Sequence, residues 1–126
     1  MLLRLIDKLY IGDSNFTDED LEYNGINYVL NLGGVEIKTK VANDHIHLKD
    51  DGTNTKLDFS TTLSFIDEAI QRGYRTLVCC REGRSRSVSM AVQYFMKYGW
   101  SKDDALAYIK KIDPLAQVHR DLWRSF

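Results

Sequence analysis

The stretch "LVCCREGRSRSVSM" (residues 77–90) contains both cysteines of the chain, Cys79 and Cys80, and a dense group of arginines and serines directly after them. The residues that lead into it, "RTLVCC", form an apolar run with the length of a strand that is buried on both faces. The residues after Arg86, "SVSMAVQYFMKYG", are apolar almost all round, which is typical of a helix at the centre of a fold. The stretch therefore predicts a buried strand, a tight polar loop and a buried helix in succession.

Three other segments have the length and pattern of strands. Residues 4–12, "RLIDKLYIG", predict one or two short strands at an edge of a sheet. Ile26–Leu32 is a strongly apolar run that two glycines end, and residues 44–48, "DHIHL", alternate as a strand does. The segment "DDGTNT" (residues 50–55) is rich in turn residues and predicts a loop.

Helices are predicted between these strands. Thr17 begins one with a pattern typical of a capping box, and residues 56–72 repeat apolar side chains at helical spacing. Ser101 is expected to cap a further helix, and Asp113 followed by Pro114 to start a last amphipathic helix that seals the core. The order predicts one α/β domain over residues 1–126, with a central, mainly parallel sheet flanked by helices.

Composition sets limits on function. The 126 residues include 17 basic and 18 acidic side chains, so no overall charge draws the chain to nucleic acid or to a membrane surface. Charged residues interrupt the apolar N-terminal segment, "MLLRLIDKLYIG", which resembles neither a signal peptide nor a membrane span. We expect no nucleic-acid partner, no membrane insertion and a monomer.

The two cysteines indicate a reducing environment. Neighbours in sequence are badly placed for an ordinary disulfide, and the chain has no other cysteine with which either could pair. We therefore expect an intracellular, cytoplasmic location.

The predicted strand–loop–helix junction is a natural anion site. In open α/β sheets, ligands bind beyond the carboxyl ends of the strands, where loop amides and a helix N-terminus favour a phosphate group. Gly83 lets the loop bend tightly, and Arg86 can offer a planar fork to two phosphate oxygens. The same donors stabilise a thiolate over a thiol at the start of the loop. The pattern predicts that Cys80 is a nucleophile beneath a phosphate-binding loop.

Residues 80–87, "CREGRSRS", match the pattern of a cysteine, five residues, an arginine and a serine. This pattern resembles the catalytic loop of the cysteine-dependent protein tyrosine phosphatases, and within them the small dual-specificity branch. The segments "KLYIGDSNF", "NGINYVLNL", "LSFIDEAI" and "YGWSKDDALAYIKKI" are similar to other parts of that branch, in the same order. The alternative without a catalytic role is a buried cysteine that packs in the core near a surface cluster of arginines.

The resemblance implies a protein tyrosine phosphatase-like fold and hydrolysis of phosphate monoesters through a cysteinyl-phosphate, with no metal or cofactor. Cys80 would be the nucleophile, Arg86 would bind phosphate and stabilise the transition state, and Ser87 would donate a hydrogen bond to the sulfur. The intervening residues would hold the substrate's phosphate: Arg81, Glu82, Gly83, Arg84 and Ser85.

The resemblance also implies a general acid on an upstream loop, because a phosphate ester leaves poorly unless its oxygen is protonated. That loop is "LKDDGTNTK" (residues 48–56). We favour Asp51, which directly precedes Gly52, with Asp50 as the fallback and Asp58 as a distant third. The alternative is that Asp50 and Asp51 are only solvated turn residues.

One residue departs from the family. Members nearly always have a histidine before the nucleophile, whereas this chain has Cys79, which forms only weak hydrogen bonds. Three readings stay open: a slower enzyme or one that prefers higher pH, a redox partner for Cys80, and an inert buried thiol. We favour the inert thiol.

The substrate is less constrained by the sequence. The leading hypothesis is a phosphoprotein phosphatase acting on phosphotyrosine and on phosphoserine or phosphothreonine. Because Arg81 and Arg84 flank the loop, a phosphoinositide or other lipid or inositol phosphate is the alternative, unless these arginines pair with nearby acidic residues. A phosphate-binding module without turnover is a third hypothesis. His45 and His47 lack a further ligand nearby, so we expect packed or solvated histidines and not a metal site.

Overall fold

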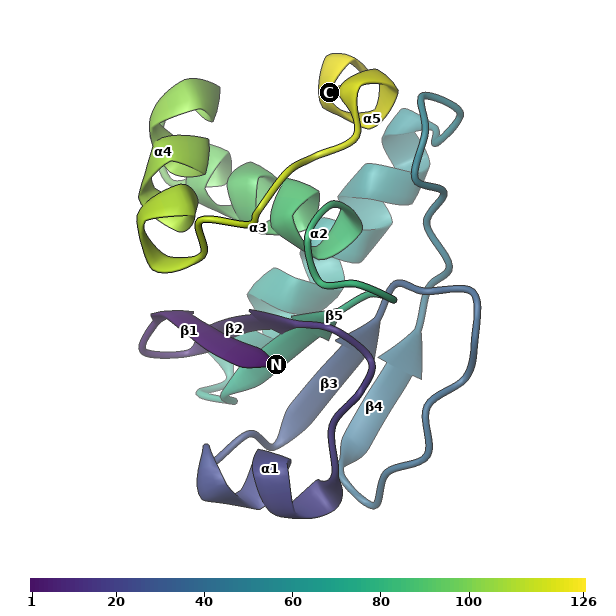
Figure 1. Cartoon of the computed structure of the whole chain (residues 1–126), viewed down its shortest axis with the longest axis vertical. Coiled ribbons are helices and arrows are strands. Elements are labelled where there is room, and N and C mark those ends of the chain that lie inside the picture. Colours follow the sequence, from purple (N-terminus) through teal and green to yellow (C-terminus); the bar gives the residue numbers. More distant parts are fainter.

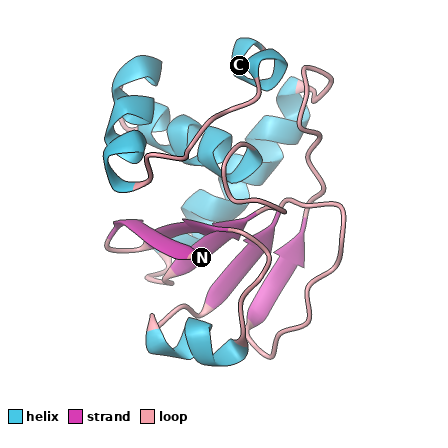
Figure 2. Cartoon of the chain, in the orientation of Figure 1, coloured by secondary structure: helices cyan, strands magenta, loops and turns pink.

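A five-stranded sheet lies at the centre of the computed structural model, which describes all 126 residues (Figures 1 and 2). The strand order is β1-β2-β5-β3-β4, in which β1 and β2 are antiparallel and the other neighbours are parallel. The strands are β1 (Leu2–Ile6), β2 (Leu9–Gly12), β3 (Tyr28–Asn31), β4 (Ala42–His45) and β5 (Thr76–Cys79). The predicted α/β class with a mainly parallel sheet is confirmed, and residues 4–12 belong to an edge hairpin.

The register of the parallel strands brings four strand ends together. Gly12 of β2 and Asn31 of β3 both lie opposite Cys79 of the central strand β5, and His45 of β4 lies opposite Asn31. The carboxyl ends of these strands therefore lie at one edge of the sheet. The loops that follow them gather at that edge, where α/β sheets bind ligands.

Helices cover both faces of the sheet. The short helix α1 lies on one face, and the other helices lie on the opposite face (Figure 1). The capping box at Thr17 is confirmed, and Ser101 caps its helix by accepting a hydrogen bond from the Asp104 amide. The helices are α1 (Asp18–Tyr23), α2 (Lys56–Gln71), α3 (Arg86–Lys97), α4 (Lys102–Ile112) and α5 (Arg120–Arg124).

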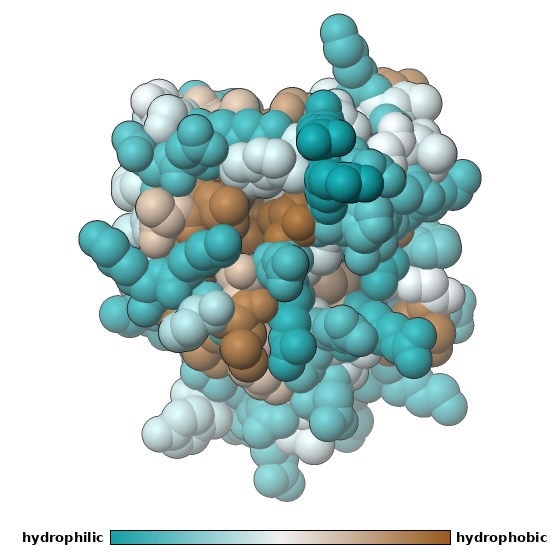
Figure 3. Space-filling view, turned by 45° about the horizontal axis from the view of Figure 1, so that its top comes forward, coloured by the Kyte–Doolittle hydropathy of each residue, from teal (hydrophilic) through white to brown (hydrophobic).

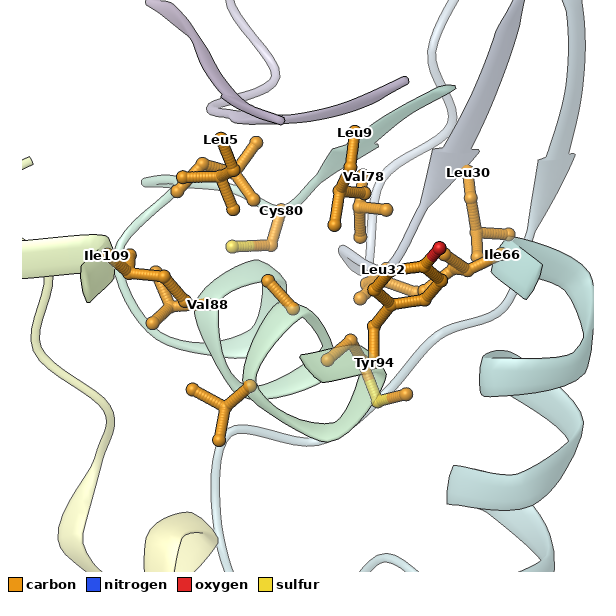
Figure 4. Close-up of a cluster of buried hydrophobic side chains, with 14 of the residues drawn as sticks. Leu5, Leu9, Leu30, Leu32, Ile66, Val78, Cys80, Val88, Tyr94 and Ile109 are labelled. Atoms are coloured by element: carbon orange, nitrogen blue, oxygen red, sulfur yellow. The ribbon is translucent and has the colours of Figure 1, made fainter. Parts of the chain in front are cut away.

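The apolar core is divided by the sheet into two parts. A cluster of 22 buried residues fills the space between the sheet and the larger helical layer, and a cluster of six lies on the other face, beneath α1. Helix α3 is buried at most of its positions, as its sequence predicts. Figure 4 shows the Cys80 side chain among the apolar side chains of the larger cluster. The nucleophile candidate thus lies where the core meets the loops.

The surface is mixed in character. In the view of Figure 3, apolar patches are separated by hydrophilic side chains. No helix of the structure has both the length and the apolar character that crossing a bilayer requires.

Strand β4 differs from its predicted position. It comprises residues 42–45 and not 44–48, and all four of its residues are exposed. Beyond His45 the chain continues beside β3 through single backbone hydrogen bonds, from Ile46 to Asn31 and from Leu48 to Leu32. The alternation in the sequence therefore reflects the burial of Leu48 in the core as the chain leaves the sheet.

The last helix also differs from the prediction. No helix begins at Asp113 and Pro114; Asp113 ends α4 in an extended conformation, and its carboxylate accepts a hydrogen bond from the Leu115 amide. The following residues are bound to the loop before α3, since the Gln117 amide donates to the Arg84 carbonyl. Helix α5 is therefore only five residues long, although its Leu122 is fully buried in the core as expected.

Candidate active site

Cys80 directly follows the central strand and lies at the base of the loop that leads into α3. Its side chain is only 2% exposed, and its sulfur accepts a hydrogen bond from the Ser87 amide at 3.5 Å. The Ser87 hydroxyl oxygen lies 3.4 Å from the same sulfur. No side chain caps the N-terminus of α3, because the hydroxyl of Ser85 at the N-cap position is bonded elsewhere. The helix N-terminus and its amides are thus directed at this thiol, an arrangement that favours negative charge.

A pocket of about 220 Å³ opens above the sulfur. Besides Cys80 and Arg86, it is lined by three other residues of the loop and by Asp50 from the loop before α2. The full lining is Asp50, Cys80, Arg81, Glu82, Ser85 and Arg86. The structure thus brings a nucleophile, a guanidinium and a carboxylate into one cavity from segments that are far apart in the sequence.

Arg86 is held in place by the loop that contributes the carboxylate. Its Nη1 atom donates a hydrogen bond to the Leu48 carbonyl at 3.2 Å. None of the six ion pairs in the structure involves the guanidinium of Arg81, Arg84 or Arg86. The alternative that Arg81 and Arg84 pair with nearby acidic residues is therefore wrong. The unpaired guanidiniums of Arg81 and Arg86 line the pocket, and that of Arg84 lines the neighbouring cavity beside α5.

The structure separates the candidate acids. Asp50 lines the pocket and accepts a hydrogen bond from the Ser85 hydroxyl, whereas Asp51 accepts hydrogen bonds from the amide and hydroxyl of Thr53. These two bonds with Thr53 lower the pKa of Asp51 below its ordinary value, and Asp51 does not line the pocket. Asp58 is committed to the capping box of α2, where it accepts a hydrogen bond from the Thr55 amide. The geometry therefore favours Asp50, which reverses the preference drawn from the sequence.

Cys79 lies on the opposite face of the sheet from Cys80. It is fully buried in the small cluster beneath α1, and burial raises the pKa of its thiol to about 12. Its sulfur lies 4.0 Å from the side-chain oxygen of Asn31. This environment matches the inert buried thiol among the three readings, since a redox partner would have to reach Cys80 from the other side of the strand.

The loop between Cys80 and Arg86 is braced by two distant segments. Gly83 adopts a φ of 70°, and a β-carbon at this position would lie 2.6 Å from backbone atoms at the end of β2. On the other side, the Ser85 hydroxyl accepts a hydrogen bond from the His119 amide at 2.8 Å. The loop thus has little freedom to change shape, as a preformed oxyanion site requires.

The family model of the dual specificity phosphatase catalytic domain matches residues 9–126 of this chain. The chain belongs to this family. It therefore has the catalytic domain of a cysteine-based phosphatase, of the dual-specificity branch of the protein tyrosine phosphatase superfamily.

Individual relatives agree with this family. Mouse protein phosphatase Slingshot homolog 3 is 29% identical over 130 residues, which cover 97% of this chain and 20% of that protein. Dual specificity protein phosphatase 1 of Arabidopsis thaliana is 42% identical over 74 residues, 58% of this chain and 37% of the relative. This chain therefore spans about a fifth of the Slingshot protein and just over a third of the plant protein.

Solved structures share the fold over the whole chain. A mouse putative dual specificity phosphatase complexed with zinc tungstate has a TM-score of 0.89 and 27% identity, and the match covers 98% of this chain and 82% of that one. Human DUSP28 has a TM-score of 0.88 at 24% identity, with 98% and 92% coverage.

The sequence did not reveal several residues that shape the site. The Leu48 carbonyl fixes Arg86, and the buried Asn31 side chain holds the turn after β3 by accepting from the Gly33 amide and donating to the Val35 carbonyl. Asn31 is a polar residue inside the apolar run "YVLNL", and this position indicates a buried side chain that needs hydrogen-bond partners. Nothing in the sequence marks Leu48, because only its backbone is used.

Proposed function

We propose that this protein hydrolyses phosphate monoesters with Cys80 as the nucleophile, Arg86 as the phosphate-binding group and Asp50 as the general acid and base. The observation behind the proposal is that these three side chains line one pocket of about 220 Å³ at the N-terminus of α3. The complex of a mouse relative with zinc tungstate supports it, because tungstate is a tetrahedral oxyanion like phosphate.

In the first step, the Cys80 thiolate attacks phosphorus and forms the S–P bond as the bond to the leaving oxygen breaks. Asp50 donates its proton to that oxygen. Arg86 and the loop amides bind the non-bridging oxygens, where charge is held in the transition state. Ser87, next to the sulfur, stabilises the thiolate before attack and when it leaves again.

In the second step, a water molecule attacks phosphorus while the Asp50 carboxylate takes its proton. The S–P bond breaks, inorganic phosphate forms and Cys80 returns to the thiolate. The covalent intermediate divides one difficult displacement into two easier ones. Asp50 can serve both steps because its loop is hydrogen bonded to the phosphate loop at Ser85.

Our leading proposal for the substrate is a phosphoprotein with phosphotyrosine, phosphoserine or phosphothreonine. No aromatic side chain lines the pocket, so no stacking partner selects a phosphotyrosine ring over a shorter phosphoester. Arg81, Glu82, Gly83, Arg84 and Ser85 are proposed as the residues that surround the bound phosphate and its immediate attachment.

A phosphoinositide or other inositol phosphate is the second candidate. The unpaired guanidiniums of Arg81 and Arg84, on either side of the loop, favour it, because such substrates bring additional negative charge. Side-by-side turnover of phosphopeptides and phosphoinositides separates the two. A large preference for the polyanionic lipid that Arg84→Ala abolishes would overturn the phosphoprotein proposal.

The test of the chemistry is hydrolysis of para-nitrophenyl phosphate with a chelator present. Wild type is expected to turn over, and Cys80→Ser is expected to be inactive. Equal activity of wild type and Cys80→Ser, or no activity in wild type together with tight phosphopeptide binding, would contradict the proposed enzyme.

We also propose a cytoplasmic, monomeric protein, because both cysteines are free thiols and the proposed reaction needs Cys80 reduced. Sizing the purified protein by light scattering tests the monomer.

A further inference from the structure

A second cavity adjoins the pocket above Cys80. It has a volume of about 620 Å³ and shares Arg81 and Arg86 with the smaller pocket. We call it the β-edge crevice; its lining is Ser14, Asn31, Gly33, Gly34, Val35, His47, Arg81 and Arg86. A group bound in it would therefore be continuous with a phosphate held above the cysteine.

The β-edge crevice is built by the aligned strand ends. Ser14 follows β2, Arg81 follows β5, Gly33 and Gly34 follow β3, and His47 follows β4. Each of these residues lies within three positions of the end of its strand, so the sheet fixes the point at which each of these loops begins. The sheet thus sets the relative positions of the loops that line the crevice.

The turn after β3 forms one wall of the β-edge crevice. Asn31 bonds both the Gly33 amide and the Val35 carbonyl, and the His45 ring nitrogen lies 2.5 Å from the Gly33 carbonyl oxygen. A β-carbon on Gly33 would lie 3.5 Å from the Arg81 amide nitrogen, and one on Gly34 would lie 3.2 Å from a ring nitrogen of His47. Gly34 therefore lets the turn pack closely against the imidazole, whereas a β-carbon on Gly33 would meet the phosphate loop only at ordinary contact distance.

The two flanks of the phosphate loop differ in charge. The cavity on the α5 side, about 580 Å³, is lined by Asp50, Glu82 and Asp121 together with Arg84, His119 and Arg120, so its charges are mixed. The β-edge crevice contains two arginines and a histidine but no carboxylate. An acidic substrate group meets opposite charge without competing acids only on the side of the β-edge crevice.

We propose that the β-edge crevice binds a second anionic group of the substrate, next to the phosphate that is cleaved. The group is an acidic side chain or a second phosphate on a phosphopeptide, held by Arg81 and by the imidazole of His47. This inference rests on the proposed function of the Cys80 pocket. It predicts specificity for acidic phosphopeptides and assigns it to Arg81 and His47. Ser14 and His47 line the crevice and take no part in the bond-breaking steps.

The test is a set of phosphotyrosyl peptides in which each neighbouring position carries Asp or Asn in turn. In wild type, kcat/KM is expected to favour Asp over Asn by about three- to tenfold at one or two positions, the size expected for one charge contact near a surface. A parallel set with phosphoserine at the favoured position distinguishes a second phosphate from a carboxylate. A flat profile in both sets would overturn the proposal.

Two variants place the effect in the β-edge crevice. His47→Glu and Ser14→Asp introduce a carboxylate from different strand ends, and each is expected to abolish or reverse the preference for Asp. Both should leave turnover of para-nitrophenyl phosphate within about twofold of wild type, because that substrate has no second anionic group. Lys38→Gln is the matched control: it removes one positive charge from an exposed residue of the loop after β3 that does not line the crevice.

The outcomes are distinct. A preference that survives in both Ser14→Asp and His47→Glu, or that Lys38→Gln abolishes equally, would contradict the assigned location. If wild type does not hydrolyse para-nitrophenyl phosphate at all, that result would instead contradict the proposed function. If His47→Glu alone disturbs the turn at Gly34, Ser14→Asp still decides, because the Ser14 side chain makes no hydrogen bond within the protein.

Discussion

Two pairs of adjacent, chemically identical residues have opposite environments in this molecule. Cys79 and Cys80 lie on opposite faces of the sheet, one in the closed cluster beneath α1 and the other beneath the phosphate loop. Asp50 lines the pocket above Cys80, whereas Asp51 is bonded to its own loop at Thr53. In both pairs, a shift of one residue along the chain decides whether the group reaches the site.

The cause differs between the pairs. Successive side chains of a strand point to opposite faces, so the two thiols are separated by the geometry of β5 itself. The two carboxylates are separated by hydrogen bonding in a loop, where Thr53 holds one and Ser85 holds the other. In a strand, the alternation of side chains decides which of two adjacent residues faces the site. In a loop, the hydrogen-bond partners of each residue decide it.

The largest contrast is expected between the cysteines. Cys80→Ser should lower kcat for para-nitrophenyl phosphate by about 10⁴-fold or more, because it removes the nucleophile. Cys79→Ser should keep kcat within about threefold of wild type, because the Cys79 side chain does not reach the pocket. Comparable losses in both variants would show that the two faces of β5 are coupled in catalysis.

The second contrast concerns the acids. Asp50→Asn should lower kcat by about 10²-fold for a phosphopeptide, the usual share of a general acid, and less for para-nitrophenyl phosphate, whose leaving group needs less protonation. Asp51→Asn should change kcat by less than about threefold, since the low pKa of Asp51 keeps it ionised and its loop position is outside the pocket. The reverse order of the two losses would restore Asp51 as the acid.

The third contrast is chemical reactivity. Iodoacetamide at neutral pH should modify Cys80 and react with Cys79 at least about tenfold more slowly, because burial holds the pKa of the Cys79 thiol at about 12. Peptide mapping by mass spectrometry measures both rates. Vanadate should protect Cys80; protection of Cys79 instead would contradict the assignment of the pocket.

The smallest effect is expected in stability at alkaline pH. Cys79 ionises near its ordinary pKa of 9.0 when the chain is unfolded and near 12 when it is folded. The contribution of the protonated Cys79 thiol to the free energy of unfolding is therefore complete below pH 9. This contribution is lost as the pH rises from 9 towards 12, at about 1.4 kcal/mol per pH unit.

Urea unfolding tests this loss. Between pH 8 and pH 10, the free energy of unfolding of wild type should fall by about 1.4 kcal/mol more than that of Cys79→Ala. Because other groups titrate equally in both proteins, the difference isolates the buried thiol. Identical pH profiles would show that Cys79 is open to solvent.

Much of this architecture could be predicted from the sequence. The run "RTLVCC" and the helix after Arg86 specify a buried strand and a buried helix by hydrophobicity alone, and a loop with glycine and arginine between them specifies an anion site. The capping residues Thr17 and Ser101 mark helix starts because their side chains bond amides within one turn. These features depend on residues that are close together in the sequence.

What the sequence could not show depends on distant partners. The choice between Asp50 and Asp51 depends on Ser85, which lies in another loop. The segment after Asp113 forms a turn and an irregular stretch in place of a helix, because its backbone is bonded to residues 84 and 85, which outweighs its helical pattern. The extent of β4 depends on its pairing with β3 and not on its own alternation.

The close contact of Gly83 with the residues that end β2 has a consequence for engineering. The phosphate loop does not hold its shape alone, because the N-terminal hairpin supplies the surface against which it is moulded. A transplant of residues 79–87 into another α/β scaffold would reproduce the motif without its support. Grafts that also transfer the Gly12–Asp13 corner should recover oxyanion binding where the bare loop does not.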